Sequence, residues 1–157
     1  MTSTEQGARV RFPPPLVFGL AILVGVGLGY LAGPARAPIG DALRLLASGV
    51  ILACAVGLIA SALGRFRRSG QSPTPWSPSP SLILTGPYRF TRNPMYVAMT
   101  LLQIGLGLAF DNLWIALLAA PALAVIHLVA VRPEETYLAA RFGQSYAEYC
   151  ARVRRYL

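Results

Sequence analysis

Hydrophobic and polar positions follow each other in long blocks along this chain, without the short periods of a soluble domain. Four nearly uncharged apolar blocks of 16 to 19 residues are joined by short polar turns or by one long polar segment. At about 1.5 Å per helical residue, such blocks cross most of a hydrocarbon core of roughly 30 Å. The pattern therefore predicts four transmembrane helices, at about residues 16–32, 45–63, 95–110 and 113–131.

The long polar segment, residues 64–94, lies between the second and third apolar blocks. It contains four prolines at near-alternate positions, which lack the backbone donor and the free φ that a helix or sheet needs. We expect an irregular, extended loop with Trp76 as an anchor at the membrane interface. Asn93 followed by Pro94 predicts the start of the third helix, with Asn93 as its N-cap. The prolines are Pro73, Pro75, Pro78 and Pro80.

Beyond Arg132 the pattern changes to short amphipathic stretches, which predict C-terminal helices within residues 134–155. The first is expected to end at Gly143, a common helix stop. Ser145 and Glu148 have the spacing of a capping box and predict the start of the second. Both helices are expected to lie at the membrane interface without crossing it.

Composition supports this fold class. The chain has 157 residues, 55% of them hydrophobic and only 13% charged, with a mean hydropathy of +0.54. These values are typical of a single small polytopic membrane domain, residues 1–157, with an all-α fold. Cys54 and Cys150 suggest neither a disulfide framework nor a metal site. The sequence also lacks the nucleotide-binding loops of soluble enzymes.

The charge distribution predicts an orientation. All fourteen basic residues are arginines, and twelve of them fall in the N-terminal segment, in residues 64–94 or after residue 131. The other two, Arg36 and Arg44, belong to the opposite side, and Arg44 is expected to snorkel to the interface. The positive-inside rule then predicts an integral protein, most simply of a bacterial inner membrane, with both termini in the cytoplasm. Arginines that flank apolar blocks fit this topology better than a nucleic-acid-binding face, so no nucleic-acid partner is expected.

Two features of the first apolar block have more than one interpretation. A signal peptide is an alternative to a membrane helix, since Ala35-Arg36-Ala37 resembles a cleavage site, although the apolar run exceeds the usual length of roughly 7–15 residues. Gly25, Gly29 and Gly33 have the four-residue spacing of closely packed helices. They predict packing inside the protomer or, alternatively, a homo-oligomer.

Candidate chemistry gathers at the predicted cytoplasmic face. Glu134 and Glu135 follow the fourth block and could simply favour the positive end of a helix dipole. However, that block delivers them to the same face as Arg92, which on its own could be just a topological charge. His127 lies about one turn inside the membrane, where a polar side chain usually faces protein or a cavity. The sequence thus predicts a polar pocket open to the cytoplasm.

Two ordered motifs resemble the isoprenylcysteine carboxyl methyltransferases and their bacterial relatives. They are Gly86-Pro87-Tyr88 with Arg92-Asn93-Pro94-Met95-Tyr96, and Glu134-Glu135-x-x-Leu138-x-x-Arg141-Phe142-Gly143-x-x-Tyr146-x-x-Tyr149. The membrane phospholipid N-methyltransferases share a looser form of this pattern. The resemblance covers roughly residues 65–157.

The resemblance implies an S-adenosylmethionine pocket at the cytoplasmic face and a lipophilic acceptor that enters from the lipid bilayer. It implies Arg92 and Glu135 as the catalytic residues, Arg92 near the acceptor. The family often has histidine where this chain has Asn93, which cannot accept a proton at neutral pH. The cofactor-binding residues expected are Tyr88, Asn93, Pro94, Tyr96, His127, Glu134 and Glu135, with no metal.

Three functions remain open at this point. The first is methyl transfer to an isoprenylcysteine-type carboxylate or a similar small lipid, which Arg92 would favour by steering a carboxylate and repelling an ammonium group. The second is methylation of a phospholipid amine of the phosphatidylethanolamine type. The third is a non-catalytic membrane interaction protein. An enzyme of this kind requires Arg92 and Glu135 on the same membrane face, with a cavity between them.

Overall fold

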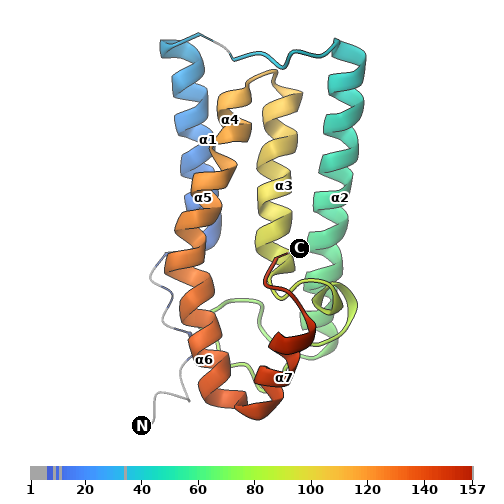
Figure 1. Ribbon diagram of the computed structural model, residues 1–157, viewed down its shortest axis with the longest axis vertical. Helices are drawn as coiled ribbons and strands as arrows, with labels where there is room; N and C mark the ends of the chain where they lie inside the picture. The colour runs from blue at the N-terminus through green and yellow to red at the C-terminus, as the bar shows by residue number, and fades with distance from the viewer. Residues whose placement is uncertain (1–6, 9, 11, 34, 157) are drawn as a thin grey trace.

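The computed structural model describes residues 7–8, 10, 12–33 and 35–156, and every regular element in that part of the chain is helical (Figure 1). This confirms the all-α fold class. Arg9 and Arg11, two of the charges used to predict the orientation, lie outside the described residues. The elements are α1 (Pro14–Leu31), α2 (Asp41–Arg68), the 3₁₀ turn η1 (Gly86–Arg89), α3 (Pro94–Ala109), α4 (Leu113–Leu117), α5 (Ala119–Ile126), the π-helical segment η2 (His127–Val131), α6 (Arg132–Phe142) and α7 (Gln144–Arg152).

Three helices of the described chain are long and apolar enough to cross a membrane: α1, α2 and the continuous helical stretch Leu113–Phe142. α3 is equally apolar but has 16 residues. Its length of about 24 Å falls short of a hydrocarbon core of roughly 30 Å. Large apolar side chains such as Leu20, Leu23 and Leu46 point outward from α1 and α2, which suits contact with lipid.

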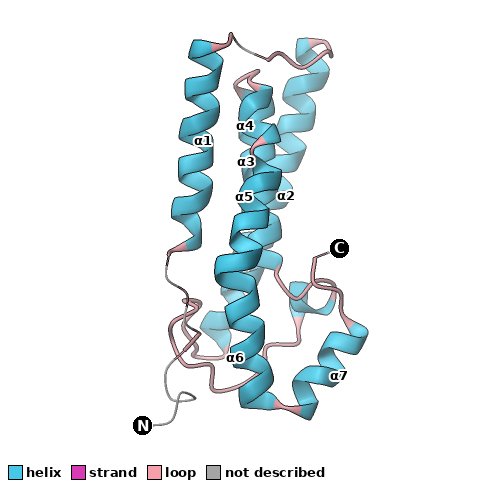
Figure 2. Cartoon of the chain, turned by 60° about the vertical axis from the view of Figure 1, so that its left-hand side comes forward, coloured by secondary structure: helices cyan, strands magenta, loops and turns pink. Residues whose placement is uncertain are grey.

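The last long helix differs from the prediction at two prolines. Pro121 lacks the amide that would bond to the carbonyl of Leu117, and the helix is interrupted at Leu118, between α4 and α5. Pro133 likewise leaves the carbonyl of Val129 without its usual donor, and η2 lies directly before it. The long helix then continues into α6 along nearly the same direction (Figure 2). The expected interfacial helix after residue 134 is therefore an extension of the long helix.

The following turn also corrects the sequence prediction. α6 ends at Phe142, as expected, and Gly143 turns the chain with a positive φ of 49°. α7 then begins at Gln144 with Gly143 as its N-cap, so Ser145 lies inside the helix and forms no capping box. One face of α7 buries Tyr146 and Tyr149, which gives this helix the amphipathic character that the pattern predicted.

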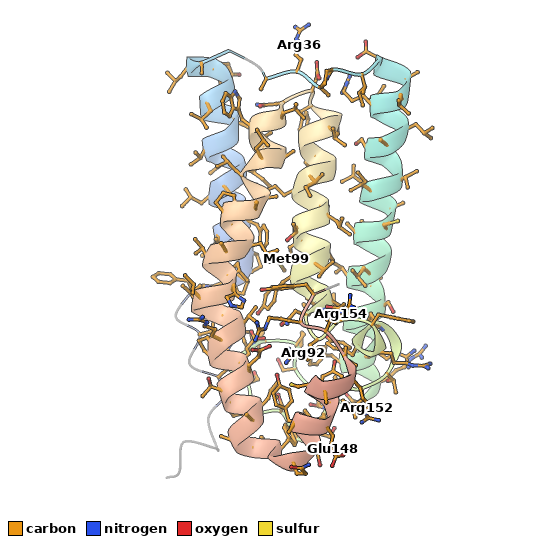
Figure 3. The ribbon with its side chains drawn as sticks, viewed as in Figure 1. Arg36, Arg92, Met99, Glu148, Arg152 and Arg154 are labelled. Atoms are coloured by element: carbon orange, nitrogen blue, oxygen red, sulfur yellow. The ribbon has the colours of Figure 1, made fainter. Side chains whose placement is uncertain are left out.

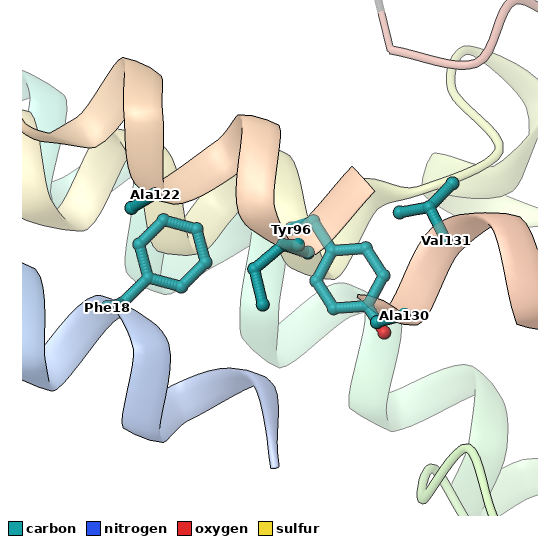
Figure 4. Close-up of a cluster of buried hydrophobic side chains, with 6 residues drawn as sticks. Phe18, Tyr96, Ala122, Ala130 and Val131 are labelled. Carbon is teal, nitrogen blue, oxygen red and sulfur yellow. The ribbon is translucent and has the colours of Figure 1, made fainter. Parts of the chain in front are cut away.

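α3 lies in the middle of the bundle and contacts α1, α2, α4 and α5. Its polar Gln103 is fully buried and donates a hydrogen bond to the carbonyl of Ile115 (2.9 Å). Toward the end of the bundle that carries residues 69–93, its Tyr96 joins a buried cluster (Figure 4). The other members of the cluster are Phe18, Ala122, Ile126, Ala130 and Val131.

Two of the first-block glycines pack inside the protomer. A Cβ on Gly25 would lie 2.8 Å from the Cα of Ile115, and one on Gly29 would lie 2.6 Å from the side-chain nitrogen of Asn112. Asn112 in turn donates to the carbonyl of Gly25 (3.2 Å). Gly33 has nothing within 4 Å of such an added atom. The close approach of α1 to α4 therefore explains Gly25 and Gly29 without a second copy of the chain.

Candidate functional site

A cavity of about 330 Å³ opens at the end of the bundle that carries residues 69–93 and α7. Its volume falls at the lower end of the range for small-molecule sites. One wall is polar and comes from η1, the start of α3, the start of α6 and α7. The polar wall carries Tyr88, Arg92, Asn93, Tyr96, Glu134, Glu135, Tyr146 and Tyr149.

The structure brings together seven of the eight predicted site residues at this cavity: Tyr88, Arg92, Asn93, Pro94, Tyr96, Glu134 and Glu135. His127 does not line it; its Nδ1 lies 3.0 Å from the hydroxyl of Tyr156. Arg92 lies at the same end of the bundle as Arg152 and Arg154, and Arg36 lies at the other (Figure 3). The arrangement required of an enzyme, with Arg92 and Glu135 together beside a cavity, is present.

Glu135 is held by two arginines. Arg155 donates through Nε to Oε1 (2.9 Å) and through Nη2 to Oε2 (2.8 Å), which is a two-pronged contact. Nη1 of Arg92 lies 3.1 Å from the same Oε1. Paired hydrogen bonds between a guanidinium and a carboxylate fix both the position and the plane of the carboxylate. Glu135 is thus neutralised and oriented before any ligand binds.

Glu134 has a different environment, although it is the adjacent residue. The hydroxyl of Tyr96 donates a short hydrogen bond to its Oε1. Within the described part of the chain, no arginine or histidine lies within ion-pair distance of it. A carboxylate at a cavity wall without a cation is electrostatically unsatisfied and attracts a cationic ligand.

Arg92 is nearly buried and has several neighbours. Besides Glu135, its Nη1 donates to Sγ of Cys150 (2.7 Å), and its Nε has no partner among the described residues. Its backbone amide donates to the carbonyl of Arg154 (2.9 Å). These contacts make Arg92 a fixed part of the wall, unlike the flexible surface charge that a topological role would predict.

Asn93 begins α3 in a way that the sequence did not predict. α3 starts at Pro94, as expected, but the side chain of Asn93 does not cap it. Its amide nitrogen instead donates to the carbonyl of Arg155 (3.0 Å), and Thr91 Oγ1 donates to the same carbonyl (3.1 Å). Asn93 therefore joins the start of α3 to residues 153–156.

Two tyrosines complete the polar wall. The hydroxyl of Tyr149 donates to the carbonyl of Tyr88 (2.7 Å), and the ring of Tyr88 packs edge-on against Phe66. Burial, together with the charge of Glu134, raises the pKa of Tyr88. Burial raises the pKa of Tyr149 to about 12. Both hydroxyls therefore remain protonated donors at physiological pH.

Apolar side chains also line the cavity, here called the apolar wall, and several of them come from the proline-rich segment. Trp76, expected only as an interface anchor, lines the cavity with Leu82 and Ile83, as do Met95 and Met99 of α3. The amide of Ala8 donates to the carbonyl of Pro75 (2.8 Å), and the amide of Ser79 donates to the hydroxyl of Tyr137 (3.1 Å). The loop is thus attached both to the N-terminal segment and to α6.

Sequence reasoning missed four contributors to the site. Arg155 was counted only as a topological charge, and Tyr137 was not singled out. Tyr146 and Tyr149 belonged to the second motif, but no role was assigned to them. The apolar face of α7 was the available signal for the last pair. No local signal identified Arg155, because its partner lies twenty residues earlier in another helix.

The fold and the cavity define a class: a helical membrane protein with a site at one end of its bundle that is lined by polar and by apolar side chains. A family model for phospholipid methyltransferases matches residues 43–145. The chain belongs to this family. Membership indicates a membrane-bound methyltransferase, and the matched residues include most of the polar wall.

The chain is also similar to the cobalt-zinc-cadmium resistance protein CzcN of Cupriavidus metallidurans. The two are 35% identical over 73 residues, which are 46% of this chain and 33% of CzcN. The chain thus spans about a third of the length of this relative. The similarity covers too little of CzcN to transfer its resistance function.

Proposed function

We propose that this protein transfers a methyl group from S-adenosylmethionine to a lipophilic acceptor at the membrane. The observation that carries this proposal is one cavity lined by polar and by apolar side chains, where the carboxylate of Glu134 has no cationic partner in the described part of the chain. The family gives the reaction class, and the walls suggest where each substrate lies.

The residues of the polar wall fit this cofactor. Its sulfonium and ammonium groups are cationic and suit Glu134. Its ribose hydroxyls are donors and suit Glu135, whose carboxylate lines the cavity while two arginines balance its charge. The rings of Tyr88 and Tyr96 offer flat apolar faces for an adenine or a sulfonium. The aromatic and acidic groups thus match the chemical parts of the ligand.

The apolar wall is the candidate acceptor side. Trp76, Leu82, Ile83 and Met99 present hydrocarbon, indole and thioether surface to the cavity. The prolines of the loop restrict its backbone, so the wall keeps its shape at a lower cost in conformational entropy. Such a surface accepts the apolar part of a lipid or a small lipophilic molecule.

The protein's own residues have a limited chemical task. The bound cofactor supplies a methyl group that is already activated for displacement, so the rate depends on alignment and on the exclusion of water. Glu135 and Tyr88 are held in place by Arg155 and Tyr149, and the apolar wall excludes water. Asn93 is committed to the carbonyl of Arg155, which leaves it no role in proton transfer.

The charge of the acceptor remains a matter for experiment. Arg92 was expected to steer a carboxylate and repel an ammonium group. Its guanidinium instead pairs with Glu135 and is largely buried, so it discriminates weakly between these acceptors. The family match supports a phospholipid amine as the second candidate. An amine acceptor must arrive neutral, since its lone pair attacks the methyl group.

We further propose that α3 completes a fourth crossing. α3 is enclosed by other helices, so a shorter hydrophobic length costs little where neighbours shield its ends. Four crossings place residues 7–15 and 153–156 on one side, which the arginine distribution assigns to the cytoplasm of a bacterial inner membrane. The cavity would then open where a soluble cofactor is available.

Titration calorimetry of the purified protein with S-adenosylmethionine tests the proposal. Binding that is about thirtyfold weaker in Glu134→Gln and unchanged in Glu148→Gln is the expected result, because Glu148 is exposed on α7 and does not line the cavity. No heat at millimolar cofactor would overturn it in favour of a non-catalytic interaction protein. Radiolabelled methyl transfer to extracted phospholipids and to lipophilic carboxylates separates the two acceptor classes.

A further inference from the structure

We propose that residues 153–156 form a clamp that holds residues 91–93, here called the cavity corner, in place. Within this clamp, Arg155 is a positioning residue that orients Glu135 without touching the ligand. The inference rests on the proposed function for its ligand, whereas the clamp itself is a property of the protein alone. Neither the family match nor the relative assigns a role to these residues, and the matched region ends at residue 145.

Residues 153–156 return from α7 to the beginning of α3 (Figure 1). Val153 is extended, with φ −122° and ψ 128°. The carbonyl of Arg154 then accepts from the amide of Arg92 (2.9 Å), and the carbonyl of Arg155 accepts from Thr91 and Asn93 (3.1 and 3.0 Å). Three hydrogen bonds thus connect two successive carbonyls to three successive residues of the cavity corner.

The side chain of Arg155 reaches Glu135 from outside the cavity. Arg155 is not among the residues that line the cavity, whereas Glu135 is. Its two-pronged contact holds both carboxylate oxygens, at 2.9 and 2.8 Å. This hydrogen bonding raises the pKa of Arg155. The side chain of Arg155 therefore meets the cavity lining at Glu135.

Tyr156 attaches residues 153–156 to a second part of the protein. The hydroxyl of Tyr156 lies 3.0 Å from Nδ1 of His127, in the π-helical segment before α6. This contact explains the polar His127 on a largely apolar helix without placing it in the cavity. The segment is thus attached to two helices, α3 at its corner and the long helix that carries Glu135.

The contact with Arg155 sets the direction in which Glu135 can accept a hydrogen bond from a ligand. A carboxylate has about four acceptor positions. Arg155 occupies one on each oxygen, and the guanidinium of Arg92 lies 3.1 Å from Oε1. The plane that Arg155 fixes therefore sets the direction of the remaining acceptor positions. Without the paired hydrogen bonds from Arg155, here called the fork, the carboxylate of Glu135 can rotate. Its oxygens then no longer accept from a ligand in one fixed direction.

The first test measures S-adenosylmethionine affinity by calorimetry. Arg155→Gln is expected to weaken binding about tenfold, the effect of one charge-assisted hydrogen bond. Arg155→Lys should weaken it nearly as much, since lysine keeps the charge but cannot form the fork. In a Glu135→Gln background, Arg155→Gln should have no further effect. Arg152→Gln is the matched control, since Arg152 lies outside the clamp, is exposed on α7 and does not line the cavity.

Full affinity in Arg155→Lys would reduce the role of Arg155 to its charge and overturn the positioning role. An additive loss in the double variant would also overturn it, since Arg155 would then act by another route. A loss equal to that of Arg155→Gln in the Arg152→Gln control would show a general charge effect and contradict the proposal.

The second test needs no cofactor. Hydrogen exchange of the ligand-free protein should be faster at the amide of Arg92 in both Arg155→Gln and Tyr156→Phe. The amide of Leu113, bonded to the carbonyl of Ala35 at the other end of the bundle (2.7 Å), should be unchanged. Unchanged exchange at Arg92 in both variants overturns the clamp. If the wild type binds no cofactor, the proposed function fails, and this measurement alone decides whether the clamp exists.

Discussion

The two ends of the helical bundle each contain a nearly buried arginine bound to carboxylates, yet only one end resembles a binding site. At the far end, Arg44 donates to the carbonyls of Leu108 and Ala109 (2.6 and 3.0 Å) and pairs with Asp41 and Asp111. These carbonyls lie in the last turn of α3, where intrahelical donors run out, although that of Leu108 also accepts from the amide of Asp111 (3.2 Å). The Arg44 cluster therefore closes the bundle, and Arg44 does not snorkel as predicted.

At the cavity end of the bundle, arginine–carboxylate pairs have a different role. Arg92 and Arg155 neutralise Glu135, but Glu134 beside it has no cationic partner among the described residues, and all but Arg155 line the cavity. A buried arginine–carboxylate pair is thus weak evidence for function on its own. The carboxylate that the fold leaves without a cation, next to an open volume, distinguishes a site from a structural cluster.

The largest expected effect is at the far end. Arg44→Ala should lower the free energy of unfolding by about 3 kcal/mol, because it removes a buried cation that pairs with Asp41 and Asp111 and donates to the carbonyls of Leu108 and Ala109. Chemical denaturation in detergent measures it. Cofactor affinity of the folded fraction should stay within about twofold of the wild type, because a structural cluster at one end does not shape the cavity at the other. A large affinity loss would remove the distinction between the two ends.

Glu134→Gln should have the opposite profile. We expect cofactor affinity to fall by about 2 kcal/mol, or about thirtyfold, because the attraction of the carboxylate for a cation is lost. Stability without ligand should not fall, since a glutamine oxygen can still accept from Tyr96. Calorimetry and denaturation of the same preparation separate the two quantities. A stability loss with unchanged affinity would make Glu134 a structural residue.

The glycines of α1 test how the bundle packs. Gly25→Ala should destabilise the fold by about 1–2 kcal/mol, because the new Cβ would meet the backbone of Ile115. Gly27→Ala is the matched control, since nothing lies within 4 Å of a Cβ at that position. Thermal unfolding compares the variants. If Gly27→Ala instead changes the oligomeric state in a mild detergent, an interface between copies is present on α1.

The smallest effect is expected at Tyr149. Tyr149→Phe removes the hydrogen bond to the carbonyl of Tyr88 and should cost about 1 kcal/mol of stability. Because the folded pKa of about 12 lies above the ordinary value near 10, the stabilisation by neutral Tyr149 persists below pH 10 and is lost as pH rises toward 12. The difference between wild type and variant should therefore narrow over that interval. A constant difference would contradict the raised pKa.

The sequence by itself determined the helical class, the apolar blocks and the corner at Asn93-Pro94. These follow from local physics: residues that avoid water over sixteen or more positions, and prolines that can only begin or interrupt a helix. The position of the apolar blocks also predicted Arg92 and the pair Glu134 and Glu135 at one face, whereas Tyr88, Asn93 and Tyr96 were expected in the site because of the resemblance to a family. Residues that are adjacent in sequence at the end of a membrane helix lie at the same membrane face.

Only the tertiary structure decided which of these groups are paired. Adjacent glutamates have the same local signal, but Glu135 meets Arg155 and Arg92, whereas Glu134 meets Tyr96. His127 was expected among the cofactor-binding residues, but in the structure its ring contacts the hydroxyl of Tyr156. Such partners are brought together by the packing of α3, α6 and residues 153–156. Because electrostatic and hydrogen-bond energies depend on distance and direction in space, sequence spacing cannot determine them.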